Sequence, residues 1–317
     1  MITGAAGFIG TLLCRKLAKE FSIITIDRNP MPKIDCENQV HIKGDITDLN
    51  FIKDIFNQYS PDVIVHCAAL SSQSLFHWKS SNHYETTNVI ATENICRQAA
   101  LVNPNVFFIF LSSISVYGEK QTNKRIKEID TLDPTSDYAK SKRDAEIRLK
   151  KLFDDGIVQK VDTLRLAPVY NSEKLSCIEK RVLAPIKMAF IRFGSGEQKI
   201  SVLAGENLAD FLLFRINQMP LLKTHSIFNV CDKMSCSFNQ IITILQKSGC
   251  YPNSIIIRIP LRWIWILTRL LGFVLTRQAK WIHSWYDKLS KDFIFDNQEI
   301  LSTGFLPKYD LESIFRK

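Results

Sequence analysis

Short apolar runs alternate with segments of helical pattern along the first half of the chain. The runs are rich in β-branched and aromatic residues, and they predict strands at 21–26, 40–43, 62–67, 106–111 and 161–166. The segments between them predict helices at 10–20, 48–58, 82–102 and 136–153. Strands that alternate with helices need crossover connections, which produce a parallel sheet covered on both faces. The pattern therefore predicts an α/β fold with a doubly wound parallel sheet.

The alternation weakens after residue 170, where helices and loops mix and one further strand is expected at 226–231. We therefore expect two domains. Residues 1–170, with a returning strand near 226–232, would form the first, and residues 171–317 would form mainly a smaller lobe that closes over a ligand.

Residues 260–276 form an apolar run that is interrupted by Arg262 and Arg269. A membrane-spanning helix needs about 20 nearly uncharged residues, so this run does not predict a span. We prefer a buried or dimer-facing helix here. Weak attachment to a membrane surface is the alternative.

Composition places the chain among ordinary globular proteins, because 46% of its 317 residues are hydrophobic and 23% are charged. No signal segment is visible at the start. The eight cysteines form no CxxC pair and the six histidines form no HxxxH spacing, so we expect reduced thiols, a cytoplasmic location and no metal. The cysteines are residues 14, 36, 67, 96, 177, 231, 236 and 250.

Lysine and arginine outnumber aspartate and glutamate by 41 to 32, which gives a net charge of +9. A basic protein favours anionic partners such as phosphorylated small molecules. The densest basic stretch, 120–127, lacks the interleaved aromatic residues of a nucleic-acid platform, so we do not expect nucleic-acid binding.

A glycine-rich turn opens the chain, with Gly4, Gly7 and Gly10 spaced as GxxGxxG before the first helix. Glycine lets the backbone approach a pyrophosphate, and the helix N-terminus favours an anion. Asp27 ends the next strand, where a carboxylate can bond the adenosine ribose hydroxyls. That carboxylate repels a 2′-phosphate and so favours NAD over NADP, although the neighbouring Arg28 acts in the opposite direction.

Two later segments are typical of the same nucleotide site. Asp45 and Ile46 follow the third strand, where an adenine would lie, and small residues at Cys67, Ala68 and Ala69 end the fourth. A helix cap and ordinary packing are the alternative interpretations of these positions.

Tyr138 and Lys142 form a YxxxK pattern on the helix expected at 136–153. Positions i and i+4 share one face of a helix, so the ammonium can lie beside the phenol and lower its pKa. A tyrosine with a lowered pKa can act as a base near neutral pH. Ser112 and Ser113 end the fifth strand, and a hydroxyl there can bond the same substrate oxygen.

Taken together, these segments resemble an extended short-chain dehydrogenase/reductase of the NAD-dependent epimerase/dehydratase family, with a Rossmann-like fold and UDP-glucose 4-epimerase-like chemistry. The matching segments, in family order, are TGAAGFIG (3–10), Asp27, GDITD (44–48), VIVHCAAL (63–70), TTNVIATENI (86–95), FLSSISVYGE (110–119), YAKSK (138–142) and LRLAPVY (164–170). Residues 226–232 and 295–307 are weaker matches.

The resemblance implies roles for individual residues. Ser113, Tyr138 and Lys142 would carry catalysis, and family members act on nucleoside-diphosphate sugars and dimerise through the helices expected here at 82–102 and 136–153. The NAD site would be lined by Phe8, Ile9, Asp27, Asp45, Ile46, Cys67, Ala68, Ala69, Leu70, Ser71 and Asn88, with Ala167 near the nicotinamide.

Several positions depart from the family pattern. Dehydratases of the family place Asp-Glu directly after the catalytic hydroxyl, where this chain has Ile114 and Ser115. Pro168 replaces a frequent substrate-binding asparagine, and Asn171 replaces a glycine. Only Met1 and Ile2 precede Thr3, so either the recorded start is clipped or the central strand of the sheet is compromised.

These features favour C4 epimerisation of a UDP-hexose or UDP-hexosamine through a 4-keto intermediate. The alternatives are an NAD(P)H-dependent reductase of 4-keto-sugar nucleotides and, from another class, a non-catalytic NAD-binding scaffold.

Overall fold

The computed structural model describes residues 1–31, 39–71, 81–118, 124–173, 175–184, 189–219, 223–249, 251, 254–274, 286 and 289–315. The chain divides into two compact units. The first comprises Met1–Val116, Ser136–Arg165 and Ala209–Phe228. The second comprises Tyr117–Thr135, Leu166–Leu208 and Asn229–Lys317. The simpler domain division expected near residue 170 remains a prediction.

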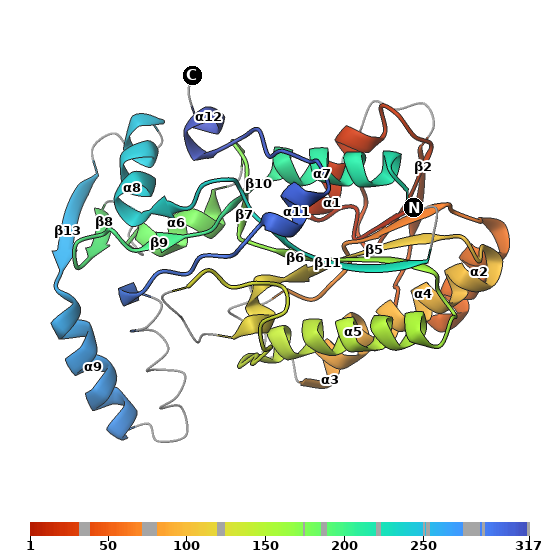
Figure 1. Cartoon of the computed structure of the whole chain (residues 1–317), viewed down its shortest axis with the longest axis horizontal. Helices are drawn as coiled ribbons and strands as arrows, with labels where there is room; N and C mark the ends of the chain where they lie inside the picture. The colour runs from red at the N-terminus through yellow and green to blue at the C-terminus, as the bar shows by residue number, and fades with distance from the viewer. Residues whose placement is uncertain are drawn as a thin grey trace. The chain divides into compact units, whose positions relative to one another are not determined.

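A seven-stranded parallel sheet forms the centre of the first unit. Its strands are β1 (Ile2–Thr3), β2 (Ile23–Asp27), β3 (Gln39–Lys43), β4 (Val63–His66), β5 (Phe107–Ser113), β6 (Lys160–Leu166) and β11 (Thr224–Val230). They lie in the order β11-β6-β5-β4-β1-β2-β3 (Figure 1). The order runs outward in both directions from β1, which confirms the doubly wound α/β fold.

The first strand contains only two residues but still pairs on both sides. Ile2 lies opposite Thr25 of β2 and Val65 of β4, so the sheet is continuous through β1. The Met1 ammonium donates to the carbonyl oxygen of Val63 at 2.7 Å, and burial lowers the pKa of this amino group to about 6. The expectation of a compromised sheet is therefore wrong for the described strands.

Helices cover both faces of this sheet. They are α1 (Phe8–Leu17), α2 (Leu49–Gln58), α3 (Ser81–Tyr84), the π-helix η1 (Glu85–Ile90), α4 (Ala91–Val102), α5 (Asp137–Asp154) and α7 (Gly205–Asn217). In Figure 1, α2, α4 and α5 lie on one face and α1 and α7 on the other. The core between sheet and helices includes Ile52, Phe56, Ile95, Phe108 and Leu149.

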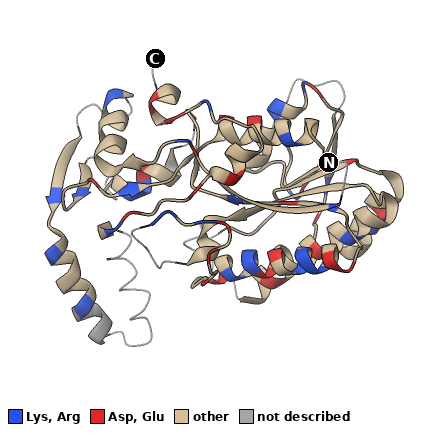
Figure 2. Ribbon diagram, in the orientation of Figure 1, with Lys and Arg blue, Asp and Glu red and all other residues tan. Residues whose placement is uncertain are grey.

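The helix expected at 82–102 is divided by the π-turn of η1, and a 3₁₀ turn, η2 (Ile114–Tyr117), follows β5 directly. The Ser136 hydroxyl accepts a hydrogen bond from the Ala139 amide, which fixes the start of α5. Figure 2 shows charges of both signs along α5, as expected for a helix with one solvent face.

Among its described residues, the second unit contains three two-stranded sheets and several helices. Its elements are β7 (Val169–Tyr170), α6 (Ser176–Val182), β8 (Ala189–Phe193), β9 (Lys199–Ile200), β10 (Leu203–Ala204), β12 (Cys236–Ser237), α8 (Phe238–Lys247), β13 (Ile255–Ile259), α9 (Leu261–Val274), α11 (Gln298–Ser302) and α12 (Leu311–Phe315). The pairs are β10-β7, β12-β9 and β13-β8. Tyr170, Ile178, Phe190, Phe238 and Ile241 form its core.

The apolar run expected at 260–276 forms α9 over 261–274, and residues 275–276 lie outside the described residues. Most of the α9 side chains whose burial is described are exposed. Trp263 is 57% exposed and Leu270 is 62% exposed, so the expectation of a buried helix is wrong, whereas a dimer-facing helix stays a prediction. Across the described residues, no helix is both long enough and apolar enough to cross a membrane.

Candidate active site

The glycine turn between β1 and α1 packs directly against the segment that follows β4. Gly4 has a φ of +68°, and a Cβ there would lie 2.6 Å from the Ala68 backbone. A Cβ on Gly10 would lie 2.2 Å from the carbonyl oxygen of Gly4. Neither position has room for a side chain, so this turn presents bare backbone at the carboxyl edge of the sheet.

The start of α1 is suited to an anion. Its N-cap is Gly7, which makes no side-chain cap, and its first turn, beginning at Phe8 and Ile9, contains no acidic residue. The Asp27 carboxylate accepts hydrogen bonds from the Ala6 amide at 3.0 Å and the Asn29 amide at 2.9 Å. The end of β2 is thereby tied to the glycine turn, in the arrangement that a dinucleotide requires.

Asp45 and its neighbours lie beyond the end of β3. Burial alone would raise the pKa of Asp45, but hydrogen bonds from Thr47 and the charge of Arg28 lower it overall. The Arg28 guanidinium lies 3.5 Å from the Asp45 carboxylate, and Ile46 is buried. Because Arg28 is paired with Asp45, its charge is partly neutralised at the position where it would otherwise favour a 2′-phosphate.

Asn88 in η1 connects the segment after β4 to the start of α5. Its side chain accepts from the Leu70 amide at 2.8 Å and donates to the Leu70 carbonyl oxygen at 3.1 Å. It also donates to the Ser141 hydroxyl at 2.9 Å. These bonds anchor at Leu70 the segment that consists of Cys67, Ala68, Ala69, Leu70 and Ser71. Burial raises the pKa of the Cys67 thiol.

His66, the last residue of β4, is completely buried between two threonines. Its Nδ1 lies 2.7 Å from the Thr3 hydroxyl and its Nε2 lies 2.9 Å from the Thr92 hydroxyl. Thr92 donates its own proton to the Asn88 carbonyl oxygen, so it accepts from Nε2–H, and Nδ1 accepts from Thr3. Burial, together with the charge of Lys142, lowers the pKa of His66 to about 3, so the ring is neutral.

Ser113 and Tyr138 meet where β5 ends and α5 begins. The Ser113 side chain acts on the Tyr138 phenol to lower its pKa, which requires the two hydroxyls to lie near one another. The Ser113 hydroxyl also accepts from the Ser115 amide at 3.2 Å and the Ser115 hydroxyl at 2.8 Å. The Tyr84 ring packs edge-on against Tyr138, with ring centroids 6.5 Å apart. Ser115 and Tyr84 are contacts that sequence reasoning missed.

Lys142 lies one turn further along α5 and is 3% exposed. Its ammonium donates to the Leu111 carbonyl oxygen at 2.7 Å and lies 4.7 Å from the centre of the Phe110 ring. Burial lowers the pKa of Lys142 to about 8.

The expectation that Lys142 lowers the pKa of Tyr138 is wrong for this structure. Burial raises the pKa of the phenol, the Ser113 hydrogen bond acts against that rise, and the Tyr84 side chain adds to it. The i,i+4 spacing places the ammonium on the correct helix face, but the Leu111 carbonyl and the Phe110 ring hold it.

Glu146, one further turn along, completes this face of α5. Its carboxylate accepts from the Ser112 hydroxyl and pairs with Arg165 of β6 at 2.7 Å. All three residues are buried. The helical spacing of Tyr138, Lys142 and Glu146 could have revealed this residue from the sequence.

The remaining candidates belong to the second unit. Ala167 is buried, and its amide donates to the Val230 carbonyl oxygen at 3.0 Å. Asn171 is also buried, whereas Pro168 is half-buried.

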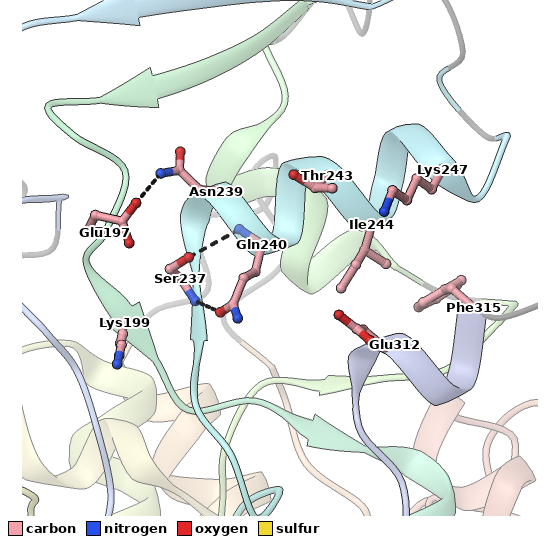
Figure 3. Close-up of a pocket in the computed structure, with 10 residues that line it drawn as sticks. All are labelled: Glu197, Lys199, Ser237, Asn239, Gln240, Thr243, Ile244, Lys247, Glu312 and Phe315. Atoms are coloured by element: carbon pink, nitrogen blue, oxygen red, sulfur yellow. Dashed lines mark hydrogen bonds between the residues drawn. The ribbon is translucent and has the colours of Figure 1, made fainter.

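A separate cavity of about 640 Å³ lies along α8 in the second unit (Figure 3). Lys199 and Lys247 line it together with Glu197 and Glu312. The Ser237 hydroxyl accepts from the Gln240 amide, which caps α8. None of the catalytic candidates lines this cavity.

The sequence itself matches a known family profile. Residues 1–231 match that of the NAD dependent epimerase/dehydratase family. The chain belongs to this family. NAD is therefore its cofactor, and the bare glycine turn and the Asp27 carboxylate fit that group. Among the described residues, no cluster of three or more His, Cys, Asp or Glu side chains could hold a metal.

Curated relatives within the family include both epimerases and dehydratases. An N-acetyl-alpha-D-glucosaminyl-diphospho-ditrans,octacis-undecaprenol 4-epimerase of Escherichia coli O157:H7 is 25% identical over 254 residues, covering 78% of this chain and 71% of the relative. The human dTDP-D-glucose 4,6-dehydratase is 29% identical over 170 residues. That match covers 49% of this chain and less than half, 46%, of the dehydratase.

Solved structures show the same fold. The UDP-glucose 4-epimerase of Thermotoga maritima, solved with UDP-glucose, gives a TM-score of 0.75 at 20% identity. The UDP-Glc/GlcNAc 4-epimerase of Campylobacter jejuni gives the same two values. Each match covers 99% of this chain and 95% of the other.

Proposed function

We propose that the protein inverts C4 of a nucleotide sugar, a UDP-hexose or UDP-hexosamine, through a 4-keto intermediate. The observation that carries this proposal is that Ser113, the last residue of β5, lies near Tyr138 in the first turn of α5, so that two hydroxyls meet at the carboxyl end of β5. Both hydroxyls lie in the first unit with the glycine turn and Asp27. Parallel sheets bind ligands at this edge, which supports a common site for nucleotide and sugar.

The residues after Ser113 support epimerisation over dehydration. Ile114 is buried, and Ser115 uses its hydroxyl to hold Ser113. Loss of water from a 4-keto sugar requires a base for the C5 proton and an acid for the departing hydroxyl. Neither side chain can supply such a group.

NAD, when bound, supplies the acceptor and the donor for the hydride at C4. The residues that would hold it are Gly4, Gly7, Phe8, Ile9, Gly10, Asp27 and the segment anchored by Asn88. Asp27 would bond the adenosine ribose, and the start of α1 would meet the pyrophosphate.

The chain's own residues would move the proton. Tyr138 would take the proton from the sugar O4 and later return it, while Ser113 would orient the same oxygen. Lys142 would bond the nicotinamide ribose from its buried position. Because burial raises the pKa of Tyr138, the phenol is a strong base once ionised, and the Ser113 hydrogen bond helps to stabilise that form.

The proposal extends to assembly and location. A cytoplasmic homodimer would form through α4 and α5, where Leu101 and Ile147 are 73% and 57% exposed. The charged side chains on these helices suit the polar rim of such an interface.

A panel of UDP-hexoses and UDP-hexosamines, incubated with the purified protein and NAD, tests the function. We expect interconversion of two C4 epimers without accumulation of NADH. Tyr138→Phe should lower turnover by about 10²–10⁴-fold while NAD binding stays within a few-fold. A dehydrated sugar product would exclude the epimerase. Consumption of NADH or NADPH with a 4-keto substrate, without epimerisation, would instead establish the reductase.

A further inference from the structure

The strand β13 and the helix α9 follow one another in the second unit. They expose apolar side chains that have no role in the proposed catalysis. We call this the β13–α9 surface. Ile255 is 66% exposed, Trp263 57% and Leu270 62%, so more than half of each side chain faces water. The surface also includes Ile256, Ile257, Trp265, Ile266 and Leu267. Large exposed apolar patches mark sites of contact with other molecules.

The helix α9 has a defined amphipathic order. Successive residues are separated by about 100° around a helix axis. Ile266, Leu270, Trp263 and Leu267 then fall in one arc about 100° wide, which Arg262 and Arg269 border on one side. Leu261, Ile264 and Thr268 fall on the opposite side, and these are the buried or half-buried residues. The helix thus packs against the rest of the chain through a narrow stripe of residues. It presents to solvent an apolar arc with a basic border.

The charge around this surface has one sign. Between Asp232 and Asp287 the chain contains seven lysines or arginines and no aspartate or glutamate. Figure 2 shows only basic charges on β13 and α9. The Arg262 guanidinium lies 5.8 Å from the Trp263 ring centre, and that of Arg269 lies 5.5 Å from Trp265. Each of these arginines therefore lies close to a tryptophan ring, Arg262 to Trp263 within the arc and Arg269 to Trp265 outside it.

This charge pattern distinguishes between two molecules that could cover the surface, a second copy of the chain and a membrane. A two-fold dimer would bring this basic surface against an identical one, with no carboxylate between the arginines. A bilayer with anionic headgroups offers the opposite charge to Arg262 and Arg269, an apolar layer to Ile266 and Leu270, and an interface that tryptophan prefers.

We propose that the β13–α9 surface docks on the surface of a membrane that contains anionic lipids. The helix lies in the interface plane, with its apolar arc among the acyl chains and its arginines at the headgroups. This placement does not depend on the proposed epimerase activity. Docking would give the enzyme access to substrates held at a membrane.

Flotation of the full-length protein with vesicles tests this proposal. The vesicles contain phosphatidylcholine alone or an equal mixture of phosphatidylcholine and phosphatidylglycerol. We expect the protein to float with the mixed vesicles, and high salt to weaken that binding. Failure to float with either composition would overturn the proposal.

Two variants identify the surface. Trp263→Ser with Leu267→Ser should abolish flotation. Arg262→Gln with Arg269→Gln should weaken binding to the mixed vesicles by about thirtyfold, from the attraction of two arginines to an anionic surface. Circular dichroism and thermal unfolding check that each variant folds as the wild type does.

Matched controls lie elsewhere on the chain. Ile129→Ser with Leu306→Ser removes two apolar residues that are 90% and 64% exposed, and Lys53→Gln with Lys127→Gln removes two exposed charges. Both should bind vesicles as the wild type does. Equal binding by all variants would overturn the proposal. A different result would also overturn it. In that result, sedimentation shows that the wild type is a dimer and that the Trp263→Ser, Leu267→Ser variant is not, and vesicles bind neither protein.

Discussion

The Lys142 ammonium lies 2.7 Å from the carbonyl oxygen of Leu111, which joins the second turn of α5 to the end of β5. Two further pairs flank it, because Tyr138 lies near Ser113 and the Glu146 carboxylate accepts a hydrogen bond from the Ser112 hydroxyl. Three side chains one helical turn apart therefore dock α5 onto three consecutive residues of β5. This docking fixes the two hydroxyls of the candidate active site before any ligand is bound.

Glu146→Gln tests the innermost of these contacts. The substitution leaves the buried Arg165 charge without its carboxylate, which should lower the free energy of unfolding by about 3–5 kcal/mol. Urea denaturation measures it. Glu93→Gln is the control, since Glu93 pairs with the partly exposed Arg97 and Arg148, and it should cost about 1 kcal/mol or less. Equal losses in the two variants would contradict the role of the buried pair.

Gly4→Ala tests the close approach of the glycine turn to the segment after β4. Gly156 has a similar φ of +74° but no atom within 4 Å of an added Cβ. Gly156→Ala should therefore lower the free energy of unfolding by about 1–2 kcal/mol, from the backbone conformation alone. Gly4→Ala should lower the free energy of unfolding by about 1–3 kcal/mol more, because the added Cβ clashes with Ala68, and it should weaken NAD binding. Chemical denaturation measures the free energy of unfolding, and calorimetric titration measures NAD binding. Equal losses of stability in Gly4→Ala and Gly156→Ala would refute the clash.

Asp27→Asn tests the choice between NAD and NADP. The loss of a charged acceptor for the ribose hydroxyls should weaken NAD by about tenfold or more and leave NADP nearly unchanged. Asp54→Asn, on the exposed side of α2, provides the control. Titration calorimetry with both nucleotides gives the ratio of dissociation constants. Tighter binding of NADP than of NAD by the wild type would already contradict the assignment.

His66 gives a pH dependence of stability. Its pKa is about 3 in the folded protein and about 6.5 when unfolded, so the unfolded chain binds the proton first as pH falls. The contribution of His66 is complete above pH 6.5 and is lost between pH 6.5 and 3. Asp232, whose pKa burial raises to about 7, acts in the opposite direction.

The measurement therefore compares the wild type with His66→Gln at each pH, because the Asp232 contribution cancels in the difference. At pH 7.5 the wild type should be more stable. At pH 5 its advantage should shrink by about 2 kcal/mol, which corresponds to one proton over 1.5 pH units below the unfolded pKa. An advantage that does not change between these pH values would show that His66 is not held neutral.

The sequence predicted the sheet, the glycine turn, Asp27 and the shared face of Tyr138 and Lys142, because these depend on periodicity and spacing. It did not predict where the Lys142 ammonium points, since helical spacing says nothing about the Leu111 carbonyl that faces it from another strand. The link from Asn88 to Leu70 and Ser141 is also non-local. The exposure of α9 depends on which elements cover it, and an apolar pattern alone does not determine that.

In the proposed reaction, hydride leaves C4 of the sugar and returns to the same carbon. The most direct test uses a UDP-hexose labelled with deuterium at C4, incubated with the protein and NAD, with the product examined by NMR spectroscopy and mass spectrometry. We expect a C4 epimer that retains deuterium at C4. Deuterium at C6 of a 4-keto-6-deoxy product would contradict it, because it would mean that water is eliminated although Ile114 and Ser115 provide neither acid nor base.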